Sequence, residues 1–218
     1  MPAETSDHVA DLTRDPLDLG KPPISPRTSG DLAQAPLPDD LASPGLLVLS
    51  QIRTRGLSGA SDEFVELYNA GSSPITLDTG WTLVARSSNA ATFGTRWTSA
   101  NQVVPAEGHL LLAGSGYNQA HAADAQLGSI TDASALHLLH NGVIVDRVCY
   151  AYDASTRSKL ADPSYNCAGS PADNTPHNDG TSAASNSDAA LERKTASGDD
   201  ATDFGAIVPA KPRSLTSP

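Results

Sequence analysis

Two runs of sequence decide the fold: Asp62-Glu63-Phe64-Val65-Glu66-Leu67-Tyr68-Asn69 and, after a Gly-Ser-Ser-Pro turn, Ile75-Thr76-Leu77-Asp78-Thr79-Gly80-Trp81-Thr82-Leu83. Side chains alternate between the two faces of a strand, and in the first run both faces carry large side chains. This pattern is typical of a strand in the middle of a sheet. We therefore expect two paired central strands joined by a tight corner, with Trp81 filling the core of a small sandwich.

The rest of residues 45–208 also reads as short strands separated by polar turns. Asn141-Gly142 lies between two apolar runs, which is the strongest local signal for a β-hairpin because both turn positions need positive φ. With seven to nine strands and no convincing helix, the pattern predicts an all-β sandwich. The expected core residues are Val65, Leu67, Trp81, Leu83, Leu138 and Val145.

The two ends of the chain differ from this middle part. Residues 1–44 contain eight of the 16 prolines and no Phe, Tyr or Trp, so they predict a disordered Pro-rich arm or linker. Residues 45–208 form the predicted domain, and residues 209–218 read as a flexible tail.

Cys149 and Cys167 are the only cysteines. They form no CxxC motif, and no His lies beside them at zinc-finger spacing, so a zinc site is not indicated. A disulfide that closes an irregular loop is the preferred interpretation, and it would stabilise the fold by about 3 kcal/mol in an oxidising compartment. The alternative is a pair of unbridged thiols.

Composition limits the partners and the compartment. The net charge of −11 makes nucleic acid an unlikely partner, because phosphate binding needs a cationic surface. No apolar run is long enough for a transmembrane helix. The first residues lack the basic and apolar regions of a signal peptide, so either the true start lies upstream or the protein stays in the cytoplasm. Because of the cysteine pair we expect an extracytoplasmic or secreted protein.

No catalytic residue can be assigned, since the sequence contains no HExxH, GxSxG, Walker A or dinucleotide-binding motif. Glu66 is the most conspicuous carboxylate, and we expect a cross-strand ion pair with an arginine such as Arg86. His137 and His140 fall on opposite faces of a strand, so they form no chelating pair, and we expect both to face solvent.

The polar loops over residues 168–203 are the remaining place for chemistry. Asp173 and Asp179 are weak candidates for a calcium site, because calcium prefers oxygen ligands, but the spacing does not match an EF-hand and turn chemistry explains it equally well. We therefore expect no metal and no cofactor. Tyr117, Trp97 and Tyr165 lie near Gly- and Ser-rich loops, where they could line an edge that binds carbohydrate or peptide.

Several motifs, taken in order, resemble the lamin tail domain family. They are Glu63–Asn69, Ile75–Leu83, Pro105–Leu112, Leu136–Tyr150 with Asn141-Gly142 and Asp146, and the closing Leu191–Lys194 and Asp203-Phe204. The resemblance covers roughly residues 45–208 and implies an immunoglobulin-like β-sandwich. No heptad rod precedes the domain and no basic nuclear-localisation cluster occurs, so the chain is more similar to a stand-alone bacterial member than to a nuclear lamin.

The resemblance implies a non-catalytic binding or anchoring module at or outside the bacterial cell envelope. Its partner would be an unidentified protein, a cell-envelope component or a carbohydrate. The alternative is an accessory domain of a secreted hydrolase, or a hydrolase with a metal-dependent site in the 168–203 loops. A structural surface protein that associates through its strand edges is a third hypothesis.

Overall fold

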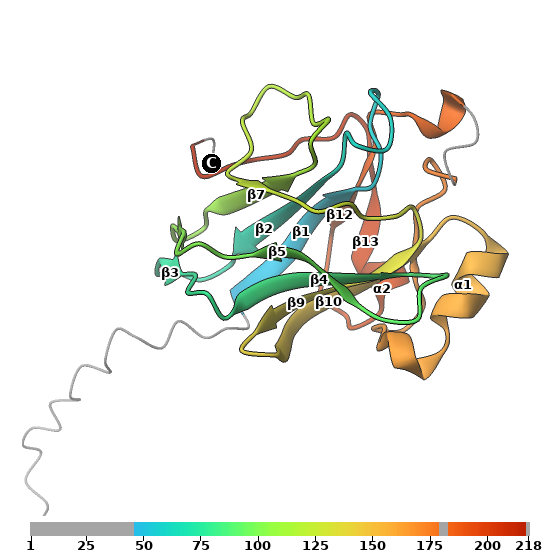
Figure 1. The fold of residues 1–218 in the computed structure, drawn as a ribbon, viewed down its shortest axis with the longest axis horizontal. Coiled ribbons are helices and arrows are strands. Elements are labelled where there is room, and N and C mark those ends of the chain that lie inside the picture. The colour runs from blue at the N-terminus through green and yellow to red at the C-terminus, as the bar shows by residue number, and fades with distance from the viewer. Residues whose placement is uncertain (1–45, 179–182, 217–218) are drawn as a thin grey trace, which may run out of the picture. The chain divides into compact units, whose positions relative to one another are not determined.

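The computed structural model describes residues 46–178 and 183–216. Within these residues two β-sheets pack face to face, and a small two-stranded sheet accompanies them (Figure 1). The architecture is an immunoglobulin-like β-sandwich, which confirms the predicted fold class. The predicted arm over residues 1–44 lies outside the described residues.

The first sheet contains the opening strand of the decisive segment. In the described part of the chain it has six strands in the order β13-β12-β1-β2-β7-β8. Their bounds are β1 Leu47–Arg53, β2 Phe64–Asn69, β7 His109–Ala113, β8 Ala125–Gln126, β12 Ala190–Arg193 and β13 Phe204–Ile207. β2 lies between β1 and β7, and both of its faces are covered, as its two rows of large side chains predict.

The second sheet has five strands among the described residues, in the order β11-β10-β9-β4-β5. Their bounds are β4 Trp81–Ser87, β5 Gly94–Thr98, β9 Ser134–His140, β10 Val143–Ala151 and β11 Ala172–Asp173. The short strands β3 (Ile75–Thr76) and β6 (Val103–Val104) pair with each other. β2 and β4 therefore belong to different sheets, and the expectation that they pair is wrong, because the corner and β3 carry the chain across the sandwich.

The main core fills the space between the two sheets. The predicted core residues that are fully part of it are Val65, Leu67, Trp81, Leu83 and Leu138. Val145 is only half-buried and packs against the edge of this core. A bulge in β10 between Ile144 and Asp146 interrupts the alternation of side chains, which explains why Val145 is less buried than its spacing suggests.

The hairpin of β9 and β10 has the turn that the sequence predicts. Asn141 and Gly142 have φ values of 52° and 80°, both in the left-handed region. His140 and Val143 are directly paired on either side of the turn. The Asn-Gly pair thus fixes the register between β9 and β10.

A polar clamp joins the two sheets at the start of β1. Asp146 on β10 accepts a hydrogen bond from the backbone N–H of Leu49 (2.7 Å), and the Arg193 Nε on β12 donates to the carbonyl of Leu49 (2.9 Å). Asp146 and Arg193 also form an ion pair, with 2.6 Å between Oδ2 and Nη2. β12 pairs with β1 only at Gln51 and Ile52, so these two side chains replace a strand partner at Leu49.

Residues 210–215, near the end of the described chain, pack against the first sheet. Ala210 is buried on the outer face of the first sheet, and the Lys211 N–H donates to Oε1 of Gln51 on β1 (3.0 Å). We call residues 210–215 the C-terminal segment. The prediction of a flexible tail over 209–218 is wrong for this segment, because the side chains of Gln51 on β1 and Glu66 on β2 bind its backbone.

Helices are short. Their bounds are α1 Ala154–Leu160, η2 Pro163–Tyr165, η3 Ala183–Ser185 and α2 Asp200–Asp203. The expectation of an irregular loop between the cysteines is therefore wrong: Asp153 and Thr156 form a reciprocal capping box that starts α1. No helix in the described ranges is long and apolar enough to cross a membrane.

Trp81 gives the most direct check of the core. Its side chain is 3% exposed and its ring stacks on His140 at 4.6 Å. We predict that Trp81→Ala lowers the free energy of unfolding by about 3–5 kcal/mol, because it removes a large buried side chain. Chemical denaturation measures this value. Thr82→Ala, on the half-buried outer face of the same strand, should cost less than about 1 kcal/mol; equal effects would contradict the assignment.

Candidate functional site

Glu66 has no access to solvent and binds the C-terminal segment. Its Oε1 accepts from Ser50 Oγ (2.6 Å) and from Arg213 Nη2 (3.1 Å), and its Oε2 accepts from the Arg213 N–H (2.5 Å). His109 Nδ1 lies 3.1 Å from Oε1, close enough for an ion pair but without hydrogen-bond geometry. Burial alone would raise the pKa of Glu66, but the contacts with His109, Ser50 and Arg213 hold this pKa below its usual value. Glu66 is thus an anchor inside the fold.

The expected Glu66–Arg86 ion pair is wrong. Arg86 lies on β4 in the other sheet, where its guanidinium stacks 3.9 Å above the ring of Tyr165 and donates to Ser164 Oγ (2.9 Å). The partner that Glu66 uses, Arg213, comes from the end of the chain. Nothing in the local sequence pattern indicates that contact.

His137 is buried, against the expectation that it faces solvent. Its ring stacks on Phe93 at 4.4 Å, and its Nε2 lies 3.1 Å from the carbonyl of Tyr165, to which it donates. The segment between the two cysteines covers this face of the sheet, which explains the burial. His140 is partly exposed and lies 3.2 Å from Asp78 Oδ1.

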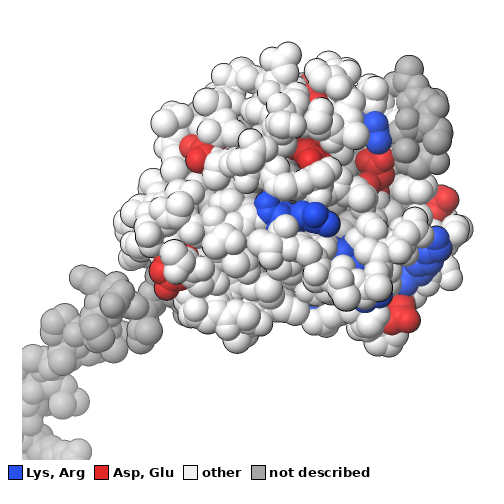
Figure 2. All heavy atoms as spheres, in the orientation of Figure 1, with Lys and Arg blue, Asp and Glu red and all other residues white. Residues whose placement is uncertain are grey.

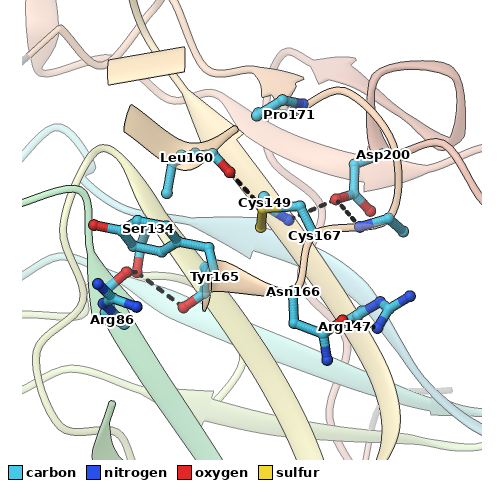
Figure 3. The surroundings of a disulfide bond; sticks show 12 residues. Arg86, Ser134, Arg147, Cys149, Leu160, Tyr165, Asn166, Cys167, Pro171 and Asp200 are labelled. Carbon is cyan, nitrogen blue, oxygen red and sulfur yellow. Dashed lines mark hydrogen bonds between the residues drawn. A yellow bond between two sulfur atoms is a disulfide. The ribbon is translucent and has the colours of Figure 1, made fainter. Parts of the chain in front are cut away.

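The disulfide between Cys149 and Cys167 ties this covering segment to β10. The two Cα atoms are 5.4 Å apart. Figure 3 shows Asp200 beside the bridge, where its Oδ2 accepts from the backbone N–H of Cys149 (2.8 Å). Burial raises the pKa of Asp200 to about 7, although backbone hydrogen bonds from Cys149 and Ala168 oppose this shift. Asp200 is therefore part of the support for the bridge.

The two weak metal candidates are not brought together. Asp173 is exposed and accepts from the N–H of Thr175 (3.0 Å), which is ordinary turn chemistry, and Asp179 lies outside the described residues. Across 46–178 and 183–216, no group of three or more His, Cys, Asp or Glu side chains has a geometry that could hold a metal ion.

The nearby acidic side chains serve the fold in the same way. Asp188 pairs with Arg53 (3.0 Å), and Asp203 accepts from Thr195 Oγ1 (2.8 Å) and the Ser197 N–H (2.6 Å). Asp188 thus binds a side chain of β1, and Asp203 binds a hydroxyl and a backbone N–H of the turn that precedes α2.

His177 is the centre of a buried polar network at the end of the sandwich. Its Nδ1 lies 3.2 Å from Asn174 Oδ1 and 3.3 Å from Thr54 Oγ1, and its Nε2 lies 3.4 Å from Ser187 Oγ. Ser187, His177 and Asn174 thus form a hydrogen-bonded row that resembles the arrangement of a Ser–His–Asp catalytic triad. However, His177 is only 1% exposed, so a substrate has no access to it. Burial lowers the pKa of His177 and keeps the ring neutral at neutral pH.

Above this network lies the loop-end pocket, a hollow of about 320 Å³ lined by Tyr152 and by residues of 54–60, 87–89 and 129–133. These loops lie at the end of the sandwich that α1 also occupies (Figure 1). Loops at one end of a sandwich are a common place for a binding site, because the sheets hold them rigidly. This pocket is the candidate functional site.

Hydrogen bonds between the loops fix the shape of the loop-end pocket. The Ser88 N–H donates to the carbonyl of Ala133 (3.0 Å), and Thr54 Oγ1 donates to Asp132 Oδ1 (2.9 Å). Below the pocket, Glu63 Oε2 accepts from the N–H of Ile130 (3.0 Å). Three separate loops are thereby held together before any ligand arrives.

The charge in the pocket is balanced. Arg55 and Asp132 are its charged lining residues within the described chain, and Arg55 Nη2 lies 3.2 Å from Asp132 Oδ2. Arg55 Nη1 also donates to Asn186 Oδ1 (3.3 Å). Both side chains are nearly buried, at 14% and 9% exposed, so the pair is held in one arrangement.

The three aromatic residues expected to line a binding edge lie elsewhere. Trp97 belongs to the main core, and Tyr165 packs below α1 beside the disulfide. Tyr117 contacts the ring of Phe64 on the outer face of the first sheet. The expectation that these residues line a site is therefore wrong for Trp97 and Tyr165, which are buried, and half-buried Tyr117 lies outside the loop-end pocket.

The surface charge is mixed. Figure 2 shows small groups of basic side chains interrupted by acidic and uncharged ones, and most of this face carries no charge. On this face the described residues form no continuous basic surface of the kind that nucleic acid binding uses. The exclusion of nucleic acid stays a prediction.

Glu63, which binds the Ile130 N–H below the pocket, makes the stability of the fold depend on pH. Burial raises the pKa of Glu63 to about 7, with the Ile130 N–H opposing the shift. A carboxyl whose pKa is raised on folding stabilises the protein below its unfolded pKa, and this stabilisation is lost as pH rises through about 7.

We predict that Glu63→Gln flattens the fall in the free energy of unfolding between pH 4.5 and pH 8 by roughly 1–3 kcal/mol. Denaturation at a series of pH values measures the difference between variant and parent. Because Asp200 titrates in the same pH range in both proteins, the difference between variant and parent isolates the contribution of Glu63. Glu107→Gln at an exposed position is the control; identical profiles for both variants would show that Glu63 is not buried as described.

Comparison with known proteins agrees with the geometry. The family model described as Lamin Tail Domain matches residues 41–151, just over half of the chain. The matched part includes β1 to β10 and most of the loop-end pocket. No curated protein matches the sequence. The chain belongs to the lamin tail domain family.

Proposed function

We propose that the protein is a non-catalytic binding or anchoring module that acts at or outside the bacterial cell envelope. Its family consists of immunoglobulin-like binding and structural modules and not of enzymes. The observation that carries the proposal is the loop-end pocket, a preformed hollow on a rigid sandwich, whose charged side chains pair with each other and whose loops are joined by hydrogen bonds. Such an arrangement suits recognition, because little ordering is needed on binding.

The disulfide supports the proposed location. Disulfides persist in oxidising compartments and are rare where glutathione and thioredoxin keep thiols reduced. Cys149 is fully buried, so the bridge is enclosed by the packing of α1 and β10. A bridge of this kind is compatible with an extracytoplasmic protein.

The alternative is a hydrolase, or its accessory domain, with a metal-dependent site in the 168–203 loops. An activity screen on the full chain, with and without a chelator, separates the two functions. The alternative would be established if the full chain hydrolysed a substrate and if both the chelator and Asp179→Ala abolished that hydrolysis. We expect to measure no hydrolysis that depends on metal.

We predict that the protein of the source organism is found in the envelope or extracellular fraction with Cys149 and Cys167 linked. Fractionation followed by non-reducing peptide mass spectrometry measures both properties. The purified full chain should also sediment with isolated envelope material. A cytoplasmic protein with two alkylatable thiols and no envelope binding would contradict the proposal.

A further inference from the structure

The electrostatics of the loop-end pocket favour an uncharged ligand. The ion pair of Arg55 and Asp132 is the only charged part of the lining in the described chain, and its two members neutralise each other. Asp132 Oδ1 is also occupied by Thr54 Oγ1. The lining therefore offers a charged ligand no net counter-charge, and breaking the pair to provide one would leave a nearly buried charge without a partner, at a cost of several kcal/mol.

The uncharged polar groups of the pocket suit hydroxyl groups. Ser87, Ser88 and Asn89 are consecutive uncharged polar residues of its lining. Asn89 accepts from Lys159 Nζ (2.6 Å) through Oδ1, which leaves its amide N–H groups as donors. A hydroxyl can both donate and accept, so a ligand rich in hydroxyls can satisfy these groups in several ways.

The size of the pocket limits the ligand to one or two rings. Its volume of about 320 Å³ lies at the lower end of the usual range for small-molecule sites. Tyr152 and Ala60 add apolar surface to the polar walls. A sugar ring presents hydroxyls at its edge and C–H groups on its face, and it therefore matches both parts of the lining.

We infer that the loop-end pocket binds an uncharged saccharide of one or two residues, held by the hydroxyls of Ser87 and Ser88 and the amide of Asn89 beside the Arg55–Asp132 pair. This inference rests on the proposed binding function and names its ligand class. It also gives the anchoring module a specific contact with envelope or extracellular glycans.

The test is an NMR titration of the isotope-labelled full chain. The probes are glucose, galactose, mannose, N-acetylglucosamine and their common disaccharides, with glucuronic and galacturonic acid as charged counterparts. We expect at least one uncharged sugar to shift the backbone amides of 54–55, 87–89 and 129–133 in a saturable manner. Shifts produced only by the acids, or shifts confined to other residues, would overturn the inference.

A blocking variant ties binding to the pocket. Ala60 is exposed on the rim and its side chain makes no hydrogen bond, so Ala60→Trp fills the pocket without breaking a bond of the fold. We expect it to weaken binding at least tenfold, or about 1.4 kcal/mol. Ala100→Trp is the control, because Ala100 is exposed beyond the opposite end of β4. Equal affinity of the two variants would overturn the inference.

Sedimentation with envelope material separates this inference from the proposed function. If Ala60→Trp loses envelope binding and Ala100→Trp keeps it, both the saccharide site and the anchoring function are supported. If both variants bind the envelope and no uncharged sugar binds the pocket, the saccharide site is wrong while the anchoring function remains. If the parent chain binds neither, both are wrong.

Discussion

The fold depends on the clamp of Asp146 and Arg193 around the backbone of Leu49. β1 is central to the first sheet, yet at Leu49 it has no strand partner on the β12 side. The backbone N–H and carbonyl there would be unpaired in a fully buried residue, at a cost of about 1–3 kcal/mol each. One carboxylate from the second sheet and one guanidinium from β12 satisfy both groups. The same two side chains thereby connect the two layers of the sandwich.

Different parts of the chain cover the outer faces of the two sheets. The outer face of the first sheet binds the C-terminal segment through Glu66, and the outer face of the second sheet is covered by α1 and the disulfide. The chain thus covers part of each face, and a hollow of about 700 Å³ lined by Tyr68, His109 and Arg213 remains on the first. The proposed binding function is placed at the end of the sandwich because hydrogen bonds hold the loops of the loop-end pocket together.

Local patterns were enough to predict β2 and the hairpin of β9 and β10. The alternation in β2 and the Asn141-Gly142 turn depend on neighbouring residues only, so the sequence contains them fully. The Asp153-x-x-Thr156 capping box was also readable and could have revealed α1. The partner of Glu66 could not be predicted, because Arg213 lies 147 residues away and many arginines were equally plausible. The pocket was missed for the same reason: its three loops meet only after folding, although the polar residues at 87–89 and 131–132 mark the strand ends that form it.

A double-mutant cycle on Asp146 and Arg193 tests the clamp most directly. The free energies of unfolding of Asp146→Ala, Arg193→Ala and the double variant give the coupling between the two side chains. We predict a coupling of roughly 1–3 kcal/mol, because both residues bind the same buried backbone group. The surface pair Glu192 and Lys194 is the control and should couple by less than about 1 kcal/mol. Additive effects of Asp146→Ala and Arg193→Ala would contradict the account.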